Sequence, residues 1–355
     1  WCEAGGVISN CIVWNNTAYR YGGGVYGGKI IGSTIEGNSA LLGGGAAYAR
    51  LEGCVVQDHK LKVLHGGGVY ECRADRCRIS GNRARELGGG IYGGETRNSW
   101  VEGNSATGSR GDGGGSAMGM LWNCILRGNE ARYGGGAALS ALINCTVVGN
   151  SARDCGGAID CAVTNGILYY NSGSPNANYE GGAYQWSCTV PLPAGLGNIT
   201  NAPGFEDNAG GDYRLRWDSP CVDAGTNMAW MVPGQPGAVD LDGAERVRNN
   251  RVDMGAQEQP LGKPTLYVRY FAKDTAELKV RNMGPEAVEY RWYTNSYLTG
   301  TGQVAGSSIQ LTGVPANSTN TMEAGRRVGG VWTPMAQAVW TQRDDVEAWL
   351  VCDEI

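Results

Sequence analysis

The sequence predicts an all-β protein, with a right-handed parallel β-helix of about 22 residues per coil followed by a small β-sandwich. Three observations predict this architecture. A glycine marker recurs along the chain, an aliphatic residue and an asparagine keep a fixed register with it, and all three features are lost after about residue 260. Glycine accounts for 59 of the 355 residues without a Gly-X-Y period, and apolar residues account for 42%. This composition argues against collagen and against disorder.

The repeat is marked by runs of two or three glycines whose second positions lie 21 to 25 residues apart. These positions are Gly23, Gly44, Gly67, Gly89, Gly114, Gly135, Gly156 and Gly181. In each interval, the residue 12 positions after the glycine is aliphatic. With Val13 before the first marker, this aliphatic slot comprises Val13, Ile35, Val56, Ile79, Val101, Leu126, Val147 and Leu168. Because one coil cannot bury its own apolar face, we expect successive coils to stack about 4.8 Å apart around a continuous core.

Two positions before the aliphatic slot the residue is always small, and the residue between the two varies freely. Side chains two positions apart share one face of a strand, so the constant slots should point inward and the variable slot outward. The small slot contains Cys11, Ser33, Cys54, Cys77, Ser99, Cys124, Cys145 and Gly166. We therefore expect its cysteines to form a buried, reduced stack. The spacing leaves open bridges between Cys72 and Cys77, Cys155 and Cys161, and Cys188 and Cys221.

Three residues after the aliphatic slot the sequence predicts an asparagine ladder that contains one histidine. Its members are Asn16, Asn38, His59, Asn82, Asn104, Asn129, Asn150 and Asn171. Asparagine tolerates the left-handed backbone angles of a coil corner, and its amide can bond to the amides of neighbouring coils. All length variation falls between this ladder and the glycines, with long loops expected at 59–66, 104–113 and 171–180. Because inserted surface loops commonly carry function, this edge is where we expect a ligand.

The steps Gly37-Asn38-Ser39-Ala40 and Gly149-Asn150-Ser151-Ala152, with the glycine runs, resemble repeats of bacterial polymorphic outer-membrane and pectin-lyase-like β-helix proteins over residues 1–190. Residues 191–260 are expected to form terminal coils and a cap. There, Ser219-Pro220-Cys221-Val222-Asp223-Ala224-Gly225-Thr226, Asp240-Leu241-Asp242-Gly243 and Asp253-Met254-Gly255-Ala256-Gln257-Glu258 resemble the terminal segment of choice-of-anchor Q surface proteins. The resemblance implies an exported bacterial protein and transfers no catalytic residue. Arg246 is expected to pair with nearby carboxylates.

Residues 261–355 show short alternating strands that indicate a β-sandwich. The expected strands are Thr265 to Tyr270, Ala276 to Arg281, Ala287 to Tyr293, Ser308 to Leu311, Thr319 to Glu323, Val328 to Trp332 and Ala336 to Thr341. The stretch Ile309 to Asn317, followed by Val331-Trp332-Thr333-Pro334, resembles a fibronectin type III module. Such a module on a bacterial protein implies a spacer or a binding unit.

Catalytic candidates are few. His59, with Asp58 and Lys60 beside it, fits a general base, and with His65 it fits a pair of metal ligands. The competing interpretation, which we favour, is that His59 replaces an asparagine of the ladder. Asp154 and Asp160 flank one coil, but carboxylates do not share a slot in adjacent coils, as a hydrolase or lyase site would require.

Two binding candidates remain. Asp240, Asp242, Asp253 and Glu258 bring together the hard carboxylate ligands that Ca²⁺ prefers, although turn and salt-bridge roles are the commoner use. Tyr26, Tyr70, Tyr92 and Tyr184 are aligned in one slot of the repeat, which predicts a partial aromatic stripe able to stack on sugars. Packing of the same rings against the coils is the alternative, and we weight it more heavily.

Charge and hydropathy narrow the partners. The chain has 29 basic and 34 acidic residues and a net charge of -5, without a long run of either sign, which argues against nucleic acid. No apolar stretch reaches the roughly 20 residues of a membrane helix, so membrane insertion is not expected. Trp1 is not an initiator methionine, and we expect a processed or trimmed chain of extracellular or cell-surface location.

The preferred hypothesis is a non-enzymatic bacterial surface protein, an adhesin or fibre, whose β-helix is a rigid rod or a binding surface. Open coil ends would allow copies of the chain to associate into a filament, since an exposed strand edge recruits another strand. A carbohydrate or other cell-surface ligand is the second expected partner, and no cofactor other than Ca²⁺ is expected. The alternative is a polysaccharide lyase or hydrolase that acts along the long-loop edge.

Overall fold

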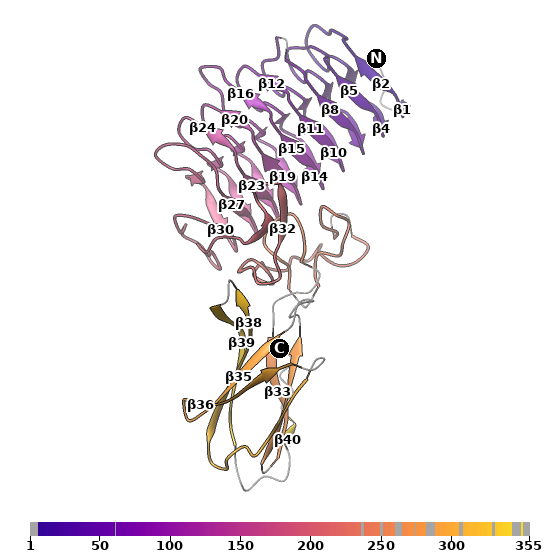
Figure 1. Cartoon of the computed structure of the whole chain (residues 1–355). Coiled ribbons are helices and arrows are strands. Elements are labelled where there is room, and N and C mark those ends of the chain that lie inside the picture. The colour runs from indigo at the N-terminus through magenta and orange to yellow at the C-terminus, as the bar shows by residue number, and fades with distance from the viewer. Residues whose placement is uncertain are drawn as a thin grey trace. The chain divides into compact units, whose positions relative to one another are not determined.

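A computed structural model describes residues 6–60, 62–235, 238–248, 251–259, 265–272, 274–281, 288–304, 308–328, 331–342 and 349–350. Every regular element in this part of the chain is a β-strand (Figure 1). The chain divides into two compact units, Trp1–Leu215 with Pro220–Glu258 and Arg216–Ser219 with Gln259–Ile355. Within the described residues there is no helix long and apolar enough to cross a membrane.

The first unit is a parallel β-solenoid of about 8 turns, which confirms the predicted all-β repeat fold. Four parallel sheets form its sides, and each coil adds one strand to a sheet, as Figure 1 shows for the row β2, β5, β8 and β11. Sheet 1 contains β1 (Val7–Ser9), β4 (Lys29–Ile31), β7 (Arg50–Glu52), β10 (Arg73–Asp75), β14 (Glu95–Arg97), β18 (Met120–Trp122), β22 (Ala141–Ile143), β26 (Ala162–Thr164) and β29 (Ala183–Gln185). Sheet 2 contains β2 (Ile12–Trp14), β5 (Thr34–Glu36), β8 (Val55–Gln57), β11 (Arg78–Ser80), β15 (Trp100–Glu102), β19 (Ile125–Arg127), β23 (Thr146–Val148), β27 (Ile167–Tyr169) and β30 (Cys188–Thr189).

Sheets 3 and 4 are made of two-residue strands. Sheet 3 contains β12 (Arg83–Ala84), β16 (Ser105–Ala106), β20 (Glu130–Ala131) and β24 (Ser151–Ala152). Sheet 4 follows the glycine runs and contains β3 (Val25–Tyr26), β6 (Ala46–Ala47), β9 (Val69–Tyr70), β13 (Ile91–Tyr92), β17 (Ser116–Ala117), β21 (Ala137–Ala138), β25 (Ala158–Ile159) and β28 (Tyr179–Glu180). Because the strands pair in register, each position of the repeat becomes a column of side chains along the solenoid.

The predicted aliphatic slot forms the inner core. Ile35, Val56 and Ile79 are fully buried, and the strands that carry them pair in register. Middle residues of sheet 1, such as Ile30, and first residues of sheet 4, such as Val25, complete the same cluster. Burial of one such aliphatic side chain contributes about 1.5–3 kcal/mol, so the core column is a main source of stability.

The predicted cysteine stack is confirmed in part. Cys54, Cys77, Cys124 and Cys145 are buried free thiols of the inner slot, whereas Cys11 is exposed because it lies in the first described coil. Every cysteine in the part of the chain that the structure describes is unbridged, including the three pairs that spacing left open. Burial raises the pKa of the Cys72 and Cys161 thiols to about 12, which keeps them protonated and unreactive.

Gly181, the last of the predicted glycine markers, lies at a different corner of its coil from the other seven. In sheet 4, Tyr179 pairs with Ala158, so the glycine run of the preceding coil is matched by Asn176 to Asn178 rather than by Gly181. Gly181 and Gly182 form the following corner, where both have positive φ, as Gly27 and Gly28 do in the first coil. The loop that we expected at 171–180 is therefore no longer than the corresponding loop of the coil before it.

Residues after β30 do not simply extend the stack. The segment at 190–199 lies over the end of the solenoid, where the Trp186 N–H donates to the Leu196 carbonyl at 2.7 Å and Asn198 Nδ2 donates to the Tyr184 carbonyl at 2.9 Å. The chain then passes along the outward face of sheet 2, where Phe205, Leu215 and Met254 share a cluster with Ile167. This segment includes β31 (Phe205–Asp207) and β32 (Asp212–Leu215). The proposed domain limits at 190 and 260 stay a prediction.

That lateral cover explains an unexpected burial pattern. The variable slot of sheet 2 points outward as predicted, and Ile12 is 68% exposed there. From Ile125 onward the same slot is buried, because Gly255 and Ala256 lie against Thr146 and Ile167. The Gly255 N–H donates to the Asn165 carbonyl at 2.7 Å, and the Ala256 N–H donates to Thr146 Oγ1 at 3.1 Å.

The second unit contains two antiparallel sheets whose side chains form one buried cluster, including Leu278 from one sheet and Trp292 and Met322 from the other. One sheet has the order β37 (Ser308–Thr312), β34 (Thr275–Arg281), β33 (Thr265–Ala272), β40 (Trp349–Leu350). The other has the order β36 (Tyr297–Gln303), β35 (Glu289–Thr294), β38 (Thr319–Val328), β39 (Val331–Thr341).

One strand prediction in this unit is wrong, and one strand was missed. The expected strand Val328 to Trp332 spans a hairpin, since Val328 ends β38 and pairs with Val331 at the start of β39. The glycine-containing strand β36 was not predicted, because Gly300 and Gly302 weaken its strand signal. Ala287, the first residue of another expected strand, lies outside the described residues.

Candidate functional site

His59 lies inside the asparagine ladder and not in an exposed loop. Its side chain is fully buried, and its Nδ1 lies 2.9 Å from the backbone nitrogen of Asn38. Asn82 Oδ1 in turn accepts a hydrogen bond from the His59 N–H at 3.2 Å, so the ring takes the place of one amide. Burial lowers the pKa of His59 to about 4. A neutral buried ring in this position is a structural member of the ladder, as the competing interpretation held.

The ladder itself follows the predicted column. Asn82 Nδ2 donates to Asn104 Oδ1 at 2.9 Å, Asn129 Nδ2 donates to Asn150 Oδ1 at 2.9 Å, and the series ends at Asn178. A second ladder was missed by the sequence analysis. Asn123, Asn144 and Asn165 bond amide to amide at the corner between sheets 1 and 2, where all three have positive φ. The signal was present in the sequence, since each asparagine directly precedes the small slot.

The other catalytic candidates are not gathered around His59. Asp58 and Lys60 form an exposed ion pair with a 2.8 Å separation between Oδ1 and Nζ. Asp154 is half-buried at the loop edge, and its N–H donates to the Arg132 carbonyl. Asp160 is exposed at a corner with positive φ. Asp58, Asp154 and Asp160 therefore do not form one constellation.

Asp160 does line a groove of about 430 Å³ beside the 104–113 loop. Glu86 and Asp112 line the same groove and come from adjacent coils, joined by the Asp112 N–H donating to the Glu86 carbonyl at 3.0 Å. Burial raises the pKa of Asp112. A carboxyl group of raised pKa beside other carboxylates is the kind of arrangement that acid–base chemistry uses.

The four carboxylates proposed for Ca²⁺ lie close together, but protein donors occupy their oxygens. Asp240 Oδ1 accepts from the N–H groups of Asp242 and Ala244, and its Oδ2 accepts from the Glu258 N–H at 2.8 Å. Glu258 Oε1 lies 3.1 Å from Nη2 of Arg246, with both side chains buried. Asp253 Oδ1 accepts from the Asp223 N–H, and Asp242 Oδ2 accepts from Gln257.

The cation that faces these carboxylates is therefore the Arg246 guanidinium. Its contact with Glu258 agrees with the prediction that Arg246 pairs with nearby carboxylates. Burial raises the pKa of Asp240, and it raises the pKa of Glu258 to about 8 despite the opposing effect of Arg246. In the described part of the chain, no group of three or more His, Cys, Asp or Glu side chains is arranged to hold a metal ion. The oxygens of these carboxylates accept hydrogen bonds from backbone N–H groups of turns, and Glu258 faces the Arg246 cation.

The aromatic stripe is the most developed surface feature of the solenoid. Tyr26, Tyr70 and Tyr92 share the outward column of sheet 4, and Tyr70 and Tyr92 stack with ring centroids 4.9 Å apart and planes 3° apart. Two further rings join them. Tyr48 lies 5.8 Å from Tyr26 and 5.6 Å from Tyr70, and Tyr21 lies 5.5 Å from Tyr48. We call these five residues, with His65, the tyrosine patch.

Exposure and chemistry distinguish this patch from a core cluster. Tyr48 is 47% exposed and Tyr26 36% exposed, while Tyr21, Tyr70 and Tyr92 are half-buried. Burial and the neighbouring phenols raise the pKa of Tyr48 to about 12. The Tyr48 phenol therefore stays protonated at neutral pH, when it can both donate and accept a hydrogen bond.

His65 closes one end of the patch. Its ring stacks on Tyr92 with centroids 5.3 Å apart, and its Nε2 lies 4.0 Å from Glu86 Oε2. Burial lowers the pKa of His65, and Glu86 partly opposes that effect. Glu86 also lines the groove of Asp112 and Asp160, so the tyrosine patch adjoins that groove.

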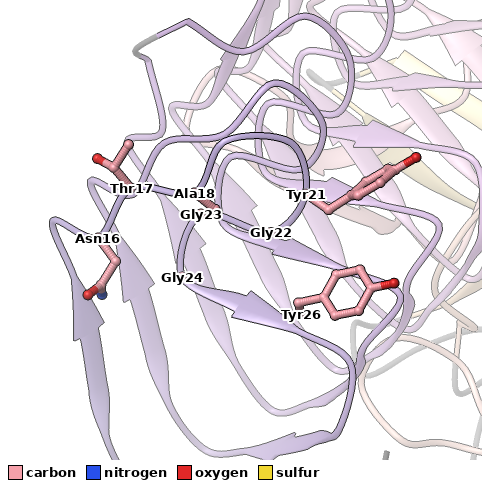
Figure 2. Close-up of a pocket in the computed structure, with 8 residues that line it drawn as sticks. All are labelled: Asn16, Thr17, Ala18, Tyr21, Gly22, Gly23, Gly24 and Tyr26. Atoms are coloured by element: carbon pink, nitrogen blue, oxygen red, sulfur yellow. The ribbon is translucent and has the colours of Figure 1, made fainter. Parts of the chain in front are cut away.

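At the other end, a cavity of about 520 Å³ is lined by Tyr21, Tyr26 and the glycines Gly22–Gly24. Figure 2 shows the side chains of Tyr21 and Tyr26 extending to the same side of this glycine run. Gly22 has φ +55, and a Cβ there would lie 2.0 Å from the Val25 carbonyl oxygen. Glycine at this corner thus lets the chain turn sharply enough to place both rings side by side.

Tyr184 does not belong to the patch. It pairs in register with Val163 of sheet 1, and its side chain is buried in the inner core against Tyr179. The equivalent of Tyr26 in that coil is Glu180, which pairs with Ile159. This error follows from the misassigned Gly181. Conversely, Tyr21 and Tyr48 were missed, and His65 was considered only as a metal ligand together with His59, because all three occupy columns beside the aligned slot.

The fold and the site define a parallel β-solenoid repeat protein with an exposed patch of tyrosine rings on its first four coils. Comparison with models of known protein families found no match, and comparison with curated proteins found no similar sequence.

Proposed function

We propose that this protein is a non-enzymatic bacterial surface protein in which the β-solenoid is a rigid scaffold and the tyrosine patch binds carbohydrate. The observation that carries the proposal is the set of five tyrosine rings, from four successive coils, with neighbouring centroids 4.9 to 6.0 Å apart on an exposed face. Aromatic faces stack on the apolar faces of sugar rings, and phenol hydroxyls bond to sugar hydroxyls.

The scaffold supports this assignment energetically. Each ring is anchored to a strand or corner whose backbone is bonded to a neighbouring coil, so binding orders few side chains. Preorganised sites lose less conformational entropy when a ligand binds. Repetition along the solenoid also suits a polymer, because sugar units of one chain can engage rings of successive coils.

The surface location rests on the resemblance to exported bacterial β-helix proteins and remains a proposal. Self-association is a separate matter. Residues 190–199 take up the strand edge of the last coil through Leu196 and Asn198. A head-to-tail filament requires a free edge at both ends of the solenoid. We therefore propose an adhesive surface and not a filament.

A glycan array probed with the labelled full chain tests the proposal. Binding to a defined set of glycans, lost in Tyr26→Ala/Tyr48→Ala and kept in Tyr297→Ala, is the expected result. Tyr297 is a matched control because its side chain is 80% exposed and lies in the second unit. Equal array signals for all three proteins would contradict a role for the patch.

A second candidate function is a carbohydrate-active enzyme, favoured by the groove of Glu86, Asp112 and Asp160 that adjoins the patch. In this alternative the raised pKa of Asp112 suits a general acid, and the tyrosine patch holds the polymer. Glycans bound on the array should then be shortened on incubation with the protein, and Asp112→Asn should stop the shortening without loss of binding. Intact glycans after prolonged incubation would rule out this alternative.

A further inference from the structure

Sheet 1 carries a charged groove, separate from the tyrosine patch, that has more cations than its carboxylates can pair. The groove has a volume of about 640 Å³, and four arginines and three carboxylates line it. These residues are Arg50, Arg73, Arg76, Arg97, Glu52, Asp75 and Glu95. Gln235 and Val239 of the lateral segment also line the groove.

Two of these arginines and a lysine beside the groove occupy one column of the sheet. Lys29 pairs in register with Arg50, and Arg50 pairs in register with Arg73. Neighbouring strands of a sheet lie about 4.8 Å apart, so these side chains leave the surface next to one another. Like charges in directly adjacent positions destabilise a sheet unless a counter-charge lies between them.

The carboxylates of the groove are already shared. Glu52 pairs with both Lys29 at 3.2 Å and Arg76 at 3.0 Å. Glu95 accepts a hydrogen bond from Arg97 Nε at 2.6 Å, and Nε of Arg73 lies 3.7 Å from its second oxygen. Asp75 lies 3.5 Å from Arg76 and accepts from Asn98.

That distribution leaves Arg50 without an ion pair among the described residues. The neighbouring Arg73 has there one ion pair, with Glu95 at 3.7 Å, and it is longer than the pairs of Glu52 and Asp75. The side chain of Arg73 is 76% exposed and Arg50 is also exposed, so both guanidinium groups are available to a ligand. Arginine differs from lysine in offering a planar fork of N–H donors that matches two oxygens of one anion. A pair of neighbouring forks matches an anion with three or more oxygens.

We propose that Arg50 and Arg73 bind a tetrahedral oxyanion, a sulfate or phosphate ester group carried by a polymeric ligand. Lys29 lies next in the column and supplies the third positive charge. Since the groove continues over several coils, ester groups repeated along a polymer can occupy it at more than one point. The inference is independent of the proposed function, because no tyrosine of the patch lines this groove.

Dextran, dextran sulfate, dextran phosphate and carboxymethyl dextran share one backbone and differ in the group attached, so they isolate the anion. Affinities are measured by surface plasmon resonance with the full chain immobilised. The sulfate or the phosphate ester, or both, should bind at least about tenfold more tightly than plain dextran. A preference for one of the two identifies the ester that the site takes. Equal binding of plain dextran or of carboxymethyl dextran would overturn the assignment.

Variants locate the site. Arg50→Gln/Arg73→Gln should lose about tenfold in affinity for the preferred ester. Arg85→Gln/Arg153→Gln, which makes the same change in net charge at exposed arginines outside the groove, should change that affinity less than about twofold. Equal losses of affinity in the two double variants would show that only the net charge of the protein matters, and they would overturn the proposed site.

Two further variants sharpen the interpretation. Arg50→Lys/Arg73→Lys keeps both charges but removes the forks, so it should also lose affinity, and full retention would contradict recognition by guanidinium groups. Tyr26→Ala/Tyr48→Ala should bind the ester as the wild type does, and a loss there would place the anion at the tyrosine patch. Unchanged thermal melting of each variant confirms that the fold is intact.

Discussion

Nδ1 of His59 lies 2.9 Å from the backbone nitrogen of Asn38, where the side-chain oxygen of an asparagine accepts the same hydrogen bond in other coils. One ring thus replaces one amide in the ladder. The replacement is incomplete, because Nε2 of His59 is buried without a hydrogen-bond partner. A buried nitrogen without a partner costs free energy.

His59 should make the stability of the solenoid depend on pH. Burial lowers its pKa from about 6.5 in the unfolded chain to about 4 in the folded protein. Between these values the unfolded chain binds more protons, so the free energy of unfolding should fall by about 3 kcal/mol as pH falls from 7 to 4. Urea unfolding at several pH values measures this slope. His59→Asn should remove this part of the slope, and an unchanged slope in the variant would contradict the assignment.

Arg246 should contribute to stability because its buried guanidinium faces Glu258 and donates to two backbone carbonyls, those of Asp253 and Gly255. Arg246→Met removes this cation and leaves both buried carbonyls without their donor, and we expect a loss of about 3–5 kcal/mol in the free energy of unfolding. The exposed pair of Arg214 and Asp212 provides the control, since Arg214→Met should cost less than about 1 kcal/mol. Denaturant titration of both variants measures the two losses in the free energy of unfolding. Similar losses would show that the buried pair contributes no more to stability than the exposed one.

Gly255 should hold the lateral segment against sheet 2. A Cβ at this position would lie 2.8 Å from Cδ1 of Ile167 and 2.9 Å from Oγ1 of Thr146. Gly255→Ala should therefore destabilise the protein by about 1–3 kcal/mol beyond the backbone strain of a positive φ. Gly243→Ala carries similar strain at φ +85 but has open space around the new methyl group. Hydrogen exchange should show faster opening of β23 and β27 only in Gly255→Ala, and equal protection in both variants would exclude this contact as the cause.

The register of the coils could be predicted because the stretch from the glycine run to the aliphatic slot never changes length. The prediction failed at Gly181 because glycines of positive φ occur at two corners of a coil, as at Gly22 and Gly27 in the first. In the last coil, glycines are present at only one of these corners. The predicted repeat was therefore aligned on Gly181 at that corner, although Asn176 to Asn178 occupy the place of the glycine run. Tyr184 was misplaced as a direct consequence.

The tyrosine patch could be predicted only along its column. Tyr26, Tyr70 and Tyr92 are related by the repeat, whereas Tyr21 and Tyr48 reach them across corners whose geometry the period does not contain. The lateral cover could not be predicted from the outward slot of sheet 2. That slot is apolar both where it is exposed, at Ile12, and where it is covered, at Ile125 and Ile167, so its composition does not mark the covered part.

Binding of carbohydrate by the tyrosine patch is the central claim, and calorimetric titration with the best glycan from the array tests it most directly. We predict saturable binding to the wild type and to Tyr297→Ala, with an affinity at least about tenfold lower for Tyr26→Ala/Tyr48→Ala. All three proteins should share one melting temperature within a few degrees, since Tyr26 and Tyr48 are exposed. Wild-type affinity in the double variant, with the fold intact, would contradict the claim.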